Sequence, residues 1–142
     1  MEFFFSAELD DQVGEAGRRV AKPLESELNS ALASEDFGPA VTSIGLIPMI
    51  LPPTWTVGHT ERRLWQRAEA SADYRLWMPY EAFRDGTDEV RRLLLVHCLL
   101  EAVRDLQRKA GARFDGRSLT TAVLRATNIA HGDLVGLPRW PC

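Results

Sequence analysis

A chain of 142 residues, 45% hydrophobic and 26% charged, has the composition of a globular protein, and we expect a single domain over residues 1–142. The net charge is −3, but residues 1–36 hold nine acidic and three basic side chains, a local charge of −6. This acidic region argues against nucleic acid as a partner and suits a basic protein, because phosphate binding needs concentrated positive charge.

The cysteines and the apolar segments indicate a cytoplasmic protein. Cys98 and Cys142 are too few for a disulfide framework, which fits a reducing compartment. The opening residues lack a signal-peptide pattern, since Glu2 stands where a basic region is expected. The apolar run at 44–51 is shorter than the roughly 20 residues that cross a bilayer, so no membrane partner is expected.

The first part of the chain predicts a strand, a helix and a second strand. Residues 2–8 are aromatic and β-prone, which favours a strand. Apolar residues at spacings of three and four over 13–31 predict one helix, kinked at Pro23. The apolar run at 40–51 predicts a central strand, with a bulge or strand end near Pro48, because proline cannot donate to a β-ladder.

The middle of the chain predicts a β-hairpin followed by a long helix. Residues 61–70 and 72–83 both alternate between apolar and polar side chains, so we expect them to pair around Ser71. Thr87 is the expected N-cap of a helix that ends at Gly111.

The last part of the chain predicts one more helix and a tail. Ser118 is the expected cap of a helix over 119–130, and an irregular tail follows from about residue 131. The order β-α-β-β-β-α-α predicts an α+β fold, with a mostly antiparallel sheet covered on one face by helices.

One apolar stretch holds a histidine, a cysteine and a glutamate, at His97, Cys98 and Glu101. On a helix, His97 and Glu101 share a face, whereas Cys98 is rotated by about 100° from His97. His97 and Cys98 therefore cannot act as a catalytic pair, and we expect both to be largely buried structural residues. A lone histidine and glutamate lack the further ligands of a zinc site.

Other catalytic patterns are missing from the sequence. It holds no G-x-S-x-G, no glycine-rich phosphate loop and no C-x-x-C. We expect surface or turn roles for His59 and His131. The sequence therefore predicts a protein that is not an enzyme, with no catalytic residues, no cofactor and no metal.

Two groups of side chains are candidates for binding a protein partner. The acidic group lies near the starts of the two longer helices and comprises Glu8, Asp10, Asp11, Glu15, Glu81, Asp85, Asp88 and Glu89. The Trp/Arg group lies on the predicted hairpin and comprises Arg63, Trp65, Arg67 and Trp77. Tryptophan and arginine are enriched at interface hot spots, although arginine stacked on aromatic rings also occurs on solvated faces. Asp88 and Glu89 also suit the positive end of their own helix.

Residues 72–103 read ADYRLWMPYEAFRDGTDEVRRLLLVHCLLEAV, a strand that runs directly into a long amphipathic helix. Together with the opening FFFSAE and the segment SIGLIPMIL, this order resembles small bacterial immunity proteins over roughly residues 1–110. These are the cognate inhibitors of polymorphic-toxin and contact-dependent growth inhibition systems. The resemblance implies a cytoplasmic, non-enzymatic protein that blocks one toxin domain, and a gene immediately downstream of the toxin gene.

Our hypothesis is an immunity protein that binds a cognate toxin domain and occludes its active site. If the toxin is a basic nuclease, carboxylates such as those of Glu81 and Asp85 would complement its phosphate-binding site. The alternative is a homodimeric interaction module of another pathway, joined through the Trp/Arg group. An enzyme is the third reading.

Overall fold

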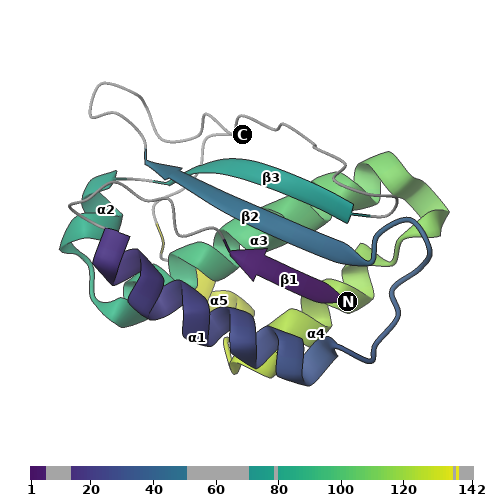
Figure 1. Ribbon diagram of the computed structural model, residues 1–142, viewed down its shortest axis with the longest axis horizontal. Coiled ribbons are helices and arrows are strands. Elements are labelled where there is room, and N and C mark those ends of the chain that lie inside the picture. The colour runs from purple at the N-terminus through teal and green to yellow at the C-terminus, as the bar shows by residue number, and fades with distance from the viewer. Residues whose placement is uncertain (6–13, 51–70, 79, 136, 138–142) are drawn as a thin grey trace.

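The computed structural model describes residues 1–5, 14–50, 71–78, 80–135 and 137, and these form a three-stranded sheet with five α-helices (Figure 1). In chain order the elements are β1 (Glu2–Phe5), α1 (Gly14–Leu32), β2 (Ser43–Ile50), β3 (Ser71–Met78), α2 (Tyr80–Asp85), α3 (Asp88–Ala110), the 3-10 turn η1 (Gly111–Arg113), α4 (Gly116–Thr127) and α5 (His131–Val135).

All three described strands run parallel, in the order β1-β2-β3, so the prediction of a mostly antiparallel sheet is wrong. The helix α1 lies between β1 and β2 in the chain and acts as the crossover that parallel neighbours need. Alternation of apolar and polar residues shows that a segment has two faces, but it carries no information on strand direction. The segment 61–70 of the expected hairpin lies outside the described residues.

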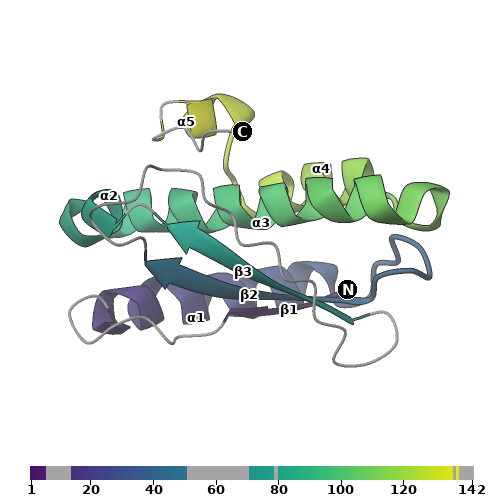
Figure 2. The same cartoon turned by 90° about the horizontal axis from the view of Figure 1, so that it is seen from above.

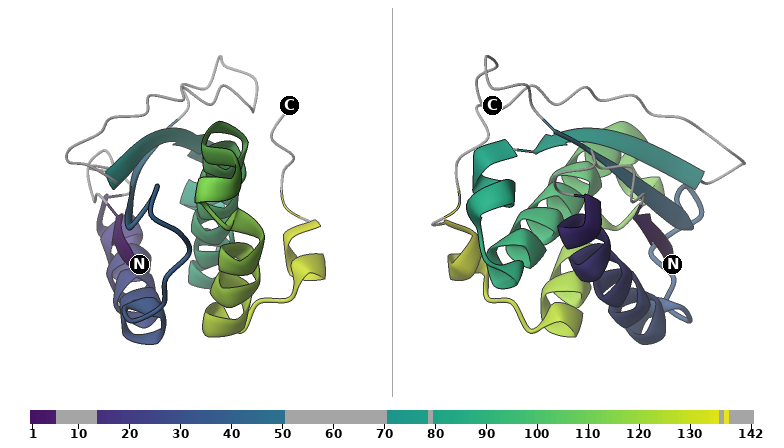
Figure 3. Two further views of the ribbon diagram at one scale, coloured as in Figure 1. Left: turned by 90° about the vertical axis from the view of Figure 1, so that its right-hand side faces the viewer. Right: turned by 60° about the vertical axis from the view of Figure 1, so that its left-hand side comes forward.

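The inner face of the sheet is apolar. The register joins its residues in two rows, Phe3–Ile44–Ala72 and Phe5–Leu46–Tyr74, each residue at most 4% exposed. Phe4, between the rows on β1, is 43% exposed. Side chains alternate across a strand, so β1 has one packed and one open face. Figure 3 shows α1, α3 and α4 gathered on one side of the sheet, where they pack against one another.

The strand β2 passes through Pro48 without a bulge in its pairing with β3, and its last described residue, Ile50, lies two positions later. Pro48 stands opposite Leu76, and the pairing with β3 continues as far as Ile50. The described pairing of β1 with β2 joins Glu2–Phe5 to Ser43–Leu46.

The prediction of a single helix through Pro23 and both predicted ends of α3 are confirmed. The helix α1 runs through Pro23 as one helix. Thr87 caps α3 by accepting a hydrogen bond from the Val90 N–H at 3.2 Å, and α3 ends at Gly111, as predicted. Gly111 has a φ of 59°, a conformation that glycine adopts without a Cβ clash.

Three element boundaries differ from the prediction. The strand expected over 72–83 ends at Met78, and α2 begins two residues later. The cap of α4 is Asp115, whose carboxylate accepts from the Ser118 N–H at 3.0 Å, so the helix starts before the expected cap Ser118. The expected tail begins with the short helix α5.

The outer edge of β1 is covered by two polar side chains of α1. The Asn29 carboxamide accepts from the Phe3 N–H at 2.8 Å and donates to the Phe3 carbonyl at 3.0 Å. The Glu25 carboxylate accepts from the Phe5 N–H at 2.8 Å. An open strand edge is a template for pairing with other chains, and here side chains occupy the bonding positions of a further strand.

One carboxylate lies in the core, at Asp105, which is 5% exposed. The Tyr74 hydroxyl donates to it at 2.9 Å, and the Lys109 ammonium lies 3.0 Å from the same oxygen. This ammonium is also 6.0 Å from the centre of the Tyr74 ring. Buried charges are retained when they are paired and hydrogen-bonded, so this group joins β3 to α3.

Candidate functional site

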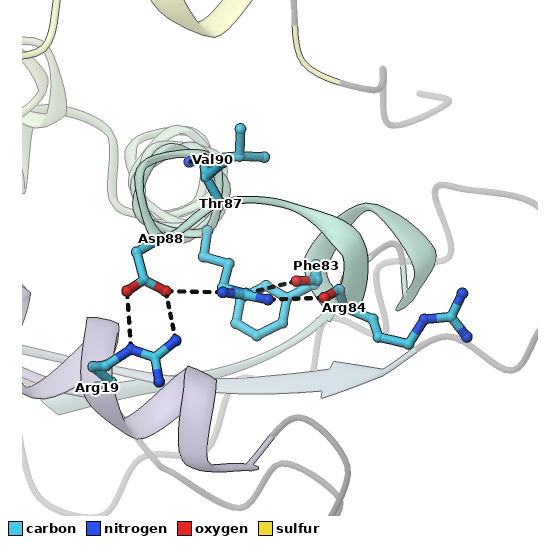
Figure 4. A network of polar contacts seen from close by, with 7 residues as sticks. Arg19, Phe83, Arg84, Thr87, Asp88 and Val90 are labelled. Atoms are coloured by element: carbon cyan, nitrogen blue, oxygen red, sulfur yellow. Dashed lines mark hydrogen bonds and ion pairs between the residues drawn. The ribbon is translucent and has the colours of Figure 1, made fainter.

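The first turn of α3 is the point where α1, α2 and α3 meet (Figure 4). Asp88 holds two arginines there. The Arg19 guanidinium of α1 binds both of its carboxylate oxygens at 2.9 Å, and Arg91 Nη1 lies 2.8 Å from Oδ1. A two-pronged arginine–carboxylate pair fixes the relative orientation of its partners. Asp88 thus sets how the start of α3 lies against α1.

Arg91 also holds the end of α2. Its Nε donates to the Phe83 carbonyl at 2.7 Å and its Nη2 to the Arg84 carbonyl at 2.8 Å. Its guanidinium lies 5.8 Å from the centre of the Phe83 ring. The last carbonyls of a helix have no partner within the helix. Arg91 supplies two of the missing donors and fixes the corner between α2 and α3.

These contacts lower the pKa values of two carboxyl groups at the corner. Hydrogen bonds from Arg19 and then Arg91 lower the pKa of Asp88 from 3.8 to about 2. A hydrogen bond from the adjacent Arg84 lowers the pKa of Asp85, with distances of 2.8 and 2.9 Å between the two side chains. Both carboxylates are therefore ionised at neutral pH and already bound to arginine.

Glu89, next along α3, differs from these two carboxylates. It is exposed, and within the described part of the chain it has no hydrogen-bond or ion-pair partner. It lines a cavity of about 210 Å³ formed by α3, the end of α4 and α5, with the lining residues Glu89, Arg92, Leu93, Asn128, Ile129 and Asp133. Figure 2 shows α5 on the side of α3 that faces away from the sheet. We call this cavity the α3–α5 pocket.

Arg92 ties the floor of the α3–α5 pocket to α1 and α4. Its Nη2 lies 3.0 and 2.9 Å from the two carboxylate oxygens of Glu27 and donates to the Thr127 carbonyl at 2.8 Å. Asp133 accepts a hydrogen bond from the Ala130 N–H at 2.9 Å, which fixes the start of α5. Two side chains of the lining, Arg92 and Asp133, are therefore held in place by the fold.

The structure places part of the acidic group together. Asp85, Asp88 and Glu89 lie within five residues at the α2–α3 corner, and Glu81 lies in the first turn of α2. Glu15 is exposed in the first turn of α1. The remaining acidic candidates, Glu8, Asp10 and Asp11, lie outside the described residues.

The Trp/Arg group is described at one position only. Trp77 stands opposite Met49 in the pairing of β2 and β3. Arg63, Trp65 and Arg67 lie outside the described residues, so their expected place on a hairpin with Trp77 stays a prediction.

The sequence analysis did not identify the two arginines of the corner, Arg19 and Arg91, or Asp133 on α5. Arg91 stands three residues after Asp88, a spacing that places the two side chains together on a helix and could have revealed the pair. Arg19 is 69 residues from Asp88 and gives no local signal. Asp133 falls within the predicted irregular tail, although it lies in a helical turn.

His97 and Cys98 lie on α3 away from this corner. Cys98 is 4% exposed, and burial raises the pKa of its thiol. His97 is half-buried, less than expected, and burial lowers its pKa. In the part of the chain that the structure describes, no three histidine, cysteine, aspartate or glutamate side chains lie close enough together to hold a metal ion.

The order of elements defines a small α/β protein, with a three-stranded parallel sheet and an acidic α2–α3 corner among its described residues. A family model of immunity proteins, Imm44 (Immunity protein 44), matches residues 1–128. The chain therefore belongs to the Immunity protein 44 family and is a bacterial immunity protein of a toxin system. No curated protein and no solved structure matches it. None of the described helices is long and apolar enough to cross a membrane.

Proposed function

We propose that this protein binds one cognate toxin domain in the cytoplasm and neutralises it by occluding its active site, without any turnover of its own. The observation that carries the proposal is the family match, which extends from β1 to the C-cap of α4. An inhibitor of this kind needs a rigid surface, because ordering mobile groups on binding costs affinity.

The α2–α3 corner supports the proposal, since it is acidic and held in place. Arg91 fixes the last turn of α2, and the ion pair between Arg19 and Asp88 fixes the first turn of α3. Asp85 and Glu89 therefore stand on anchored turns, and Glu81 lies one turn before Asp85 on α2. Acidic surfaces speed association with basic partners, and a nuclease that holds phosphates is one such partner.

The proposal is tested with the protein encoded immediately upstream in the genome. Its C-terminal domain is expressed with and without the immunity protein, and we expect growth arrest alone, rescue with the immunity protein, and co-purification of the two as a stoichiometric complex. If that domain is toxic and the immunity protein neither rescues growth nor binds it, the proposed function is wrong.

The same assay compares the two candidate surfaces. Glu81→Lys combined with Asp85→Lys should weaken toxin binding by at least ~100-fold, because a lost interfacial charge pair costs about 2–5 kcal/mol. Trp77→Ala tests the Trp/Arg group. Full affinity of the double variant together with loss of binding by Trp77→Ala would assign the interface to the sheet.

A further inference from the structure

We propose that the α3–α5 pocket receives one arginine or lysine side chain of the toxin, held by the carboxylates of Glu89 and Asp133. This inference rests on the proposed function and names the residues and the chemistry of the contact. It adds Asp133, Leu93 and Ile129 to the candidate binding residues.

The size and lining of the pocket fit a single long side chain. Its volume of about 210 Å³ is below the roughly 300–1,000 Å³ of sites that take a drug-sized ligand. Ile129 is 7% exposed and Leu93 is half-buried, so two aliphatic side chains form part of the wall. Arginine and lysine bury an aliphatic stem against such surface and keep the charged head at the polar rim.

The charge of the pocket selects a cation. Arg92 lines it, but its Nη2 is engaged by Glu27 and by the Thr127 carbonyl. With that pair neutral, Glu89 and Asp133 leave a formal charge of −2.

The helix that carries Asp133 is anchored to the core. Leu134, the next residue on α5, is 6% exposed. Hot-spot side chains of one partner commonly insert into pockets near the centre of an interface, and arginine is enriched among them.

The test uses isosteric changes that remove charge and keep shape. Glu89→Gln combined with Asp133→Asn is compared with the wild type in calorimetric titrations of the upstream-encoded toxin domain, separated from its complex by denaturant and refolded. The asparagine introduced at position 133 retains an oxygen for the Ala130 N–H. The matched control is Glu2→Gln combined with Glu35→Gln, two exposed acids outside the pocket and outside both candidate binding groups.

We expect the pocket variant to bind at least ~100-fold more weakly and the control to bind within about threefold of the wild type, with equal urea midpoints for all three proteins. A scan of toxin arginines and lysines to glutamate should identify one variant whose binding is restored by Glu89→Lys.

Other outcomes overturn the inference in distinguishable ways. Wild-type affinity in the pocket variant, or equal weakening in the control, leaves the proposed function in place and removes the pocket from the interface. If the wild type neither binds nor neutralises the toxin domain, the proposed function and the pocket fail together.

Discussion

Arg19 and Asp88, 69 residues apart in the chain, form a two-pronged ion pair between α1 and α3 with both N–O distances at 2.9 Å. The side chains are 54% and 50% exposed, so water and salt screen much of their attraction. The pair therefore contributes more to the relative orientation of the two helices than to the stability of the fold. It selects which turn of α1 meets the first turn of α3.

Replacement of Asp88 by asparagine should lower stability at neutral pH, and the difference from the wild type should shrink in acid. The pKa of Asp88 is lowered from 3.8 to about 2 in the folded protein. Its carboxylate therefore stabilises the fold above about pH 4 and loses that contribution as the pH falls through about 2. Urea midpoints at about pH 7, 4 and 2 measure this.

The control for Asp88→Asn is Glu35→Gln, an exposed carboxylate without an ion pair in the described residues. The urea midpoint of Glu35→Gln should differ little from that of the wild type at all three pH values. A constant difference between Asp88→Asn and the wild type over the whole pH range would contradict the assigned role of the two arginines.

Replacement of Tyr74 by phenylalanine should cost about 1–3 kcal/mol of unfolding free energy, because the buried carboxylate of Asp105 then loses a hydrogen-bond donor. Urea unfolding gives the value, with Val135→Ala as an exposed control expected within about 0.5 kcal/mol of the wild type. A neutral Tyr74→Phe would mean that Lys109 and the other neighbours alone satisfy Asp105.

Replacement of Asn29 by alanine should destabilise the protein by about 1–3 kcal/mol, since two hydrogen bonds to the Phe3 backbone disappear. Amide hydrogen exchange should quicken at Phe3, whose N–H loses its acceptor. Ser30→Ala, at the exposed next position, is the matched control and should change neither quantity. Unchanged exchange at Phe3 in Asn29→Ala would show that the carboxamide does not protect the edge of β1.

The thiol of Cys98 should be unreactive in the native protein, because it is buried and its pKa is raised by burial. In a Cys142→Ser background, a disulfide reagent should label Cys98 only after denaturant is added. Cys98→Ala should cost about 1–2 kcal/mol through the small cavity and leave toxin binding unchanged. Rapid labelling without denaturant, or a metal ion lost on His97→Ala, would contradict a structural role for this stretch.

The sequence predicts elements well where the signal lies within a few residues. The N-cap Thr87 and the glycine Gly111 locate both ends of α3, because capping is decided within one helical turn. The start of α4 shows the limit of this reasoning. Asp115 and Ser118 are both good caps three residues apart, and they hydrogen-bond to each other, so composition alone does not separate them.

Long-range relationships have no comparable signal. The direction of β3 depends on the path of the chain between two strands, and its alternating pattern suits parallel and antiparallel neighbours equally. The acidic residues of the α2–α3 corner could be predicted as a group from their spacing. Their arginine partner on α1 and the carboxylate on α5 could not, since tertiary packing alone brings them there.

Parallel strands have one further consequence. All three described strands end on the side of the molecule where α1 and α3 begin and where α2 lies (Figure 1). The apolar rows that hold the sheet to its helices are set by other positions. Substitutions in the turns at that end can therefore change the surface presented there while the apolar rows stay in place.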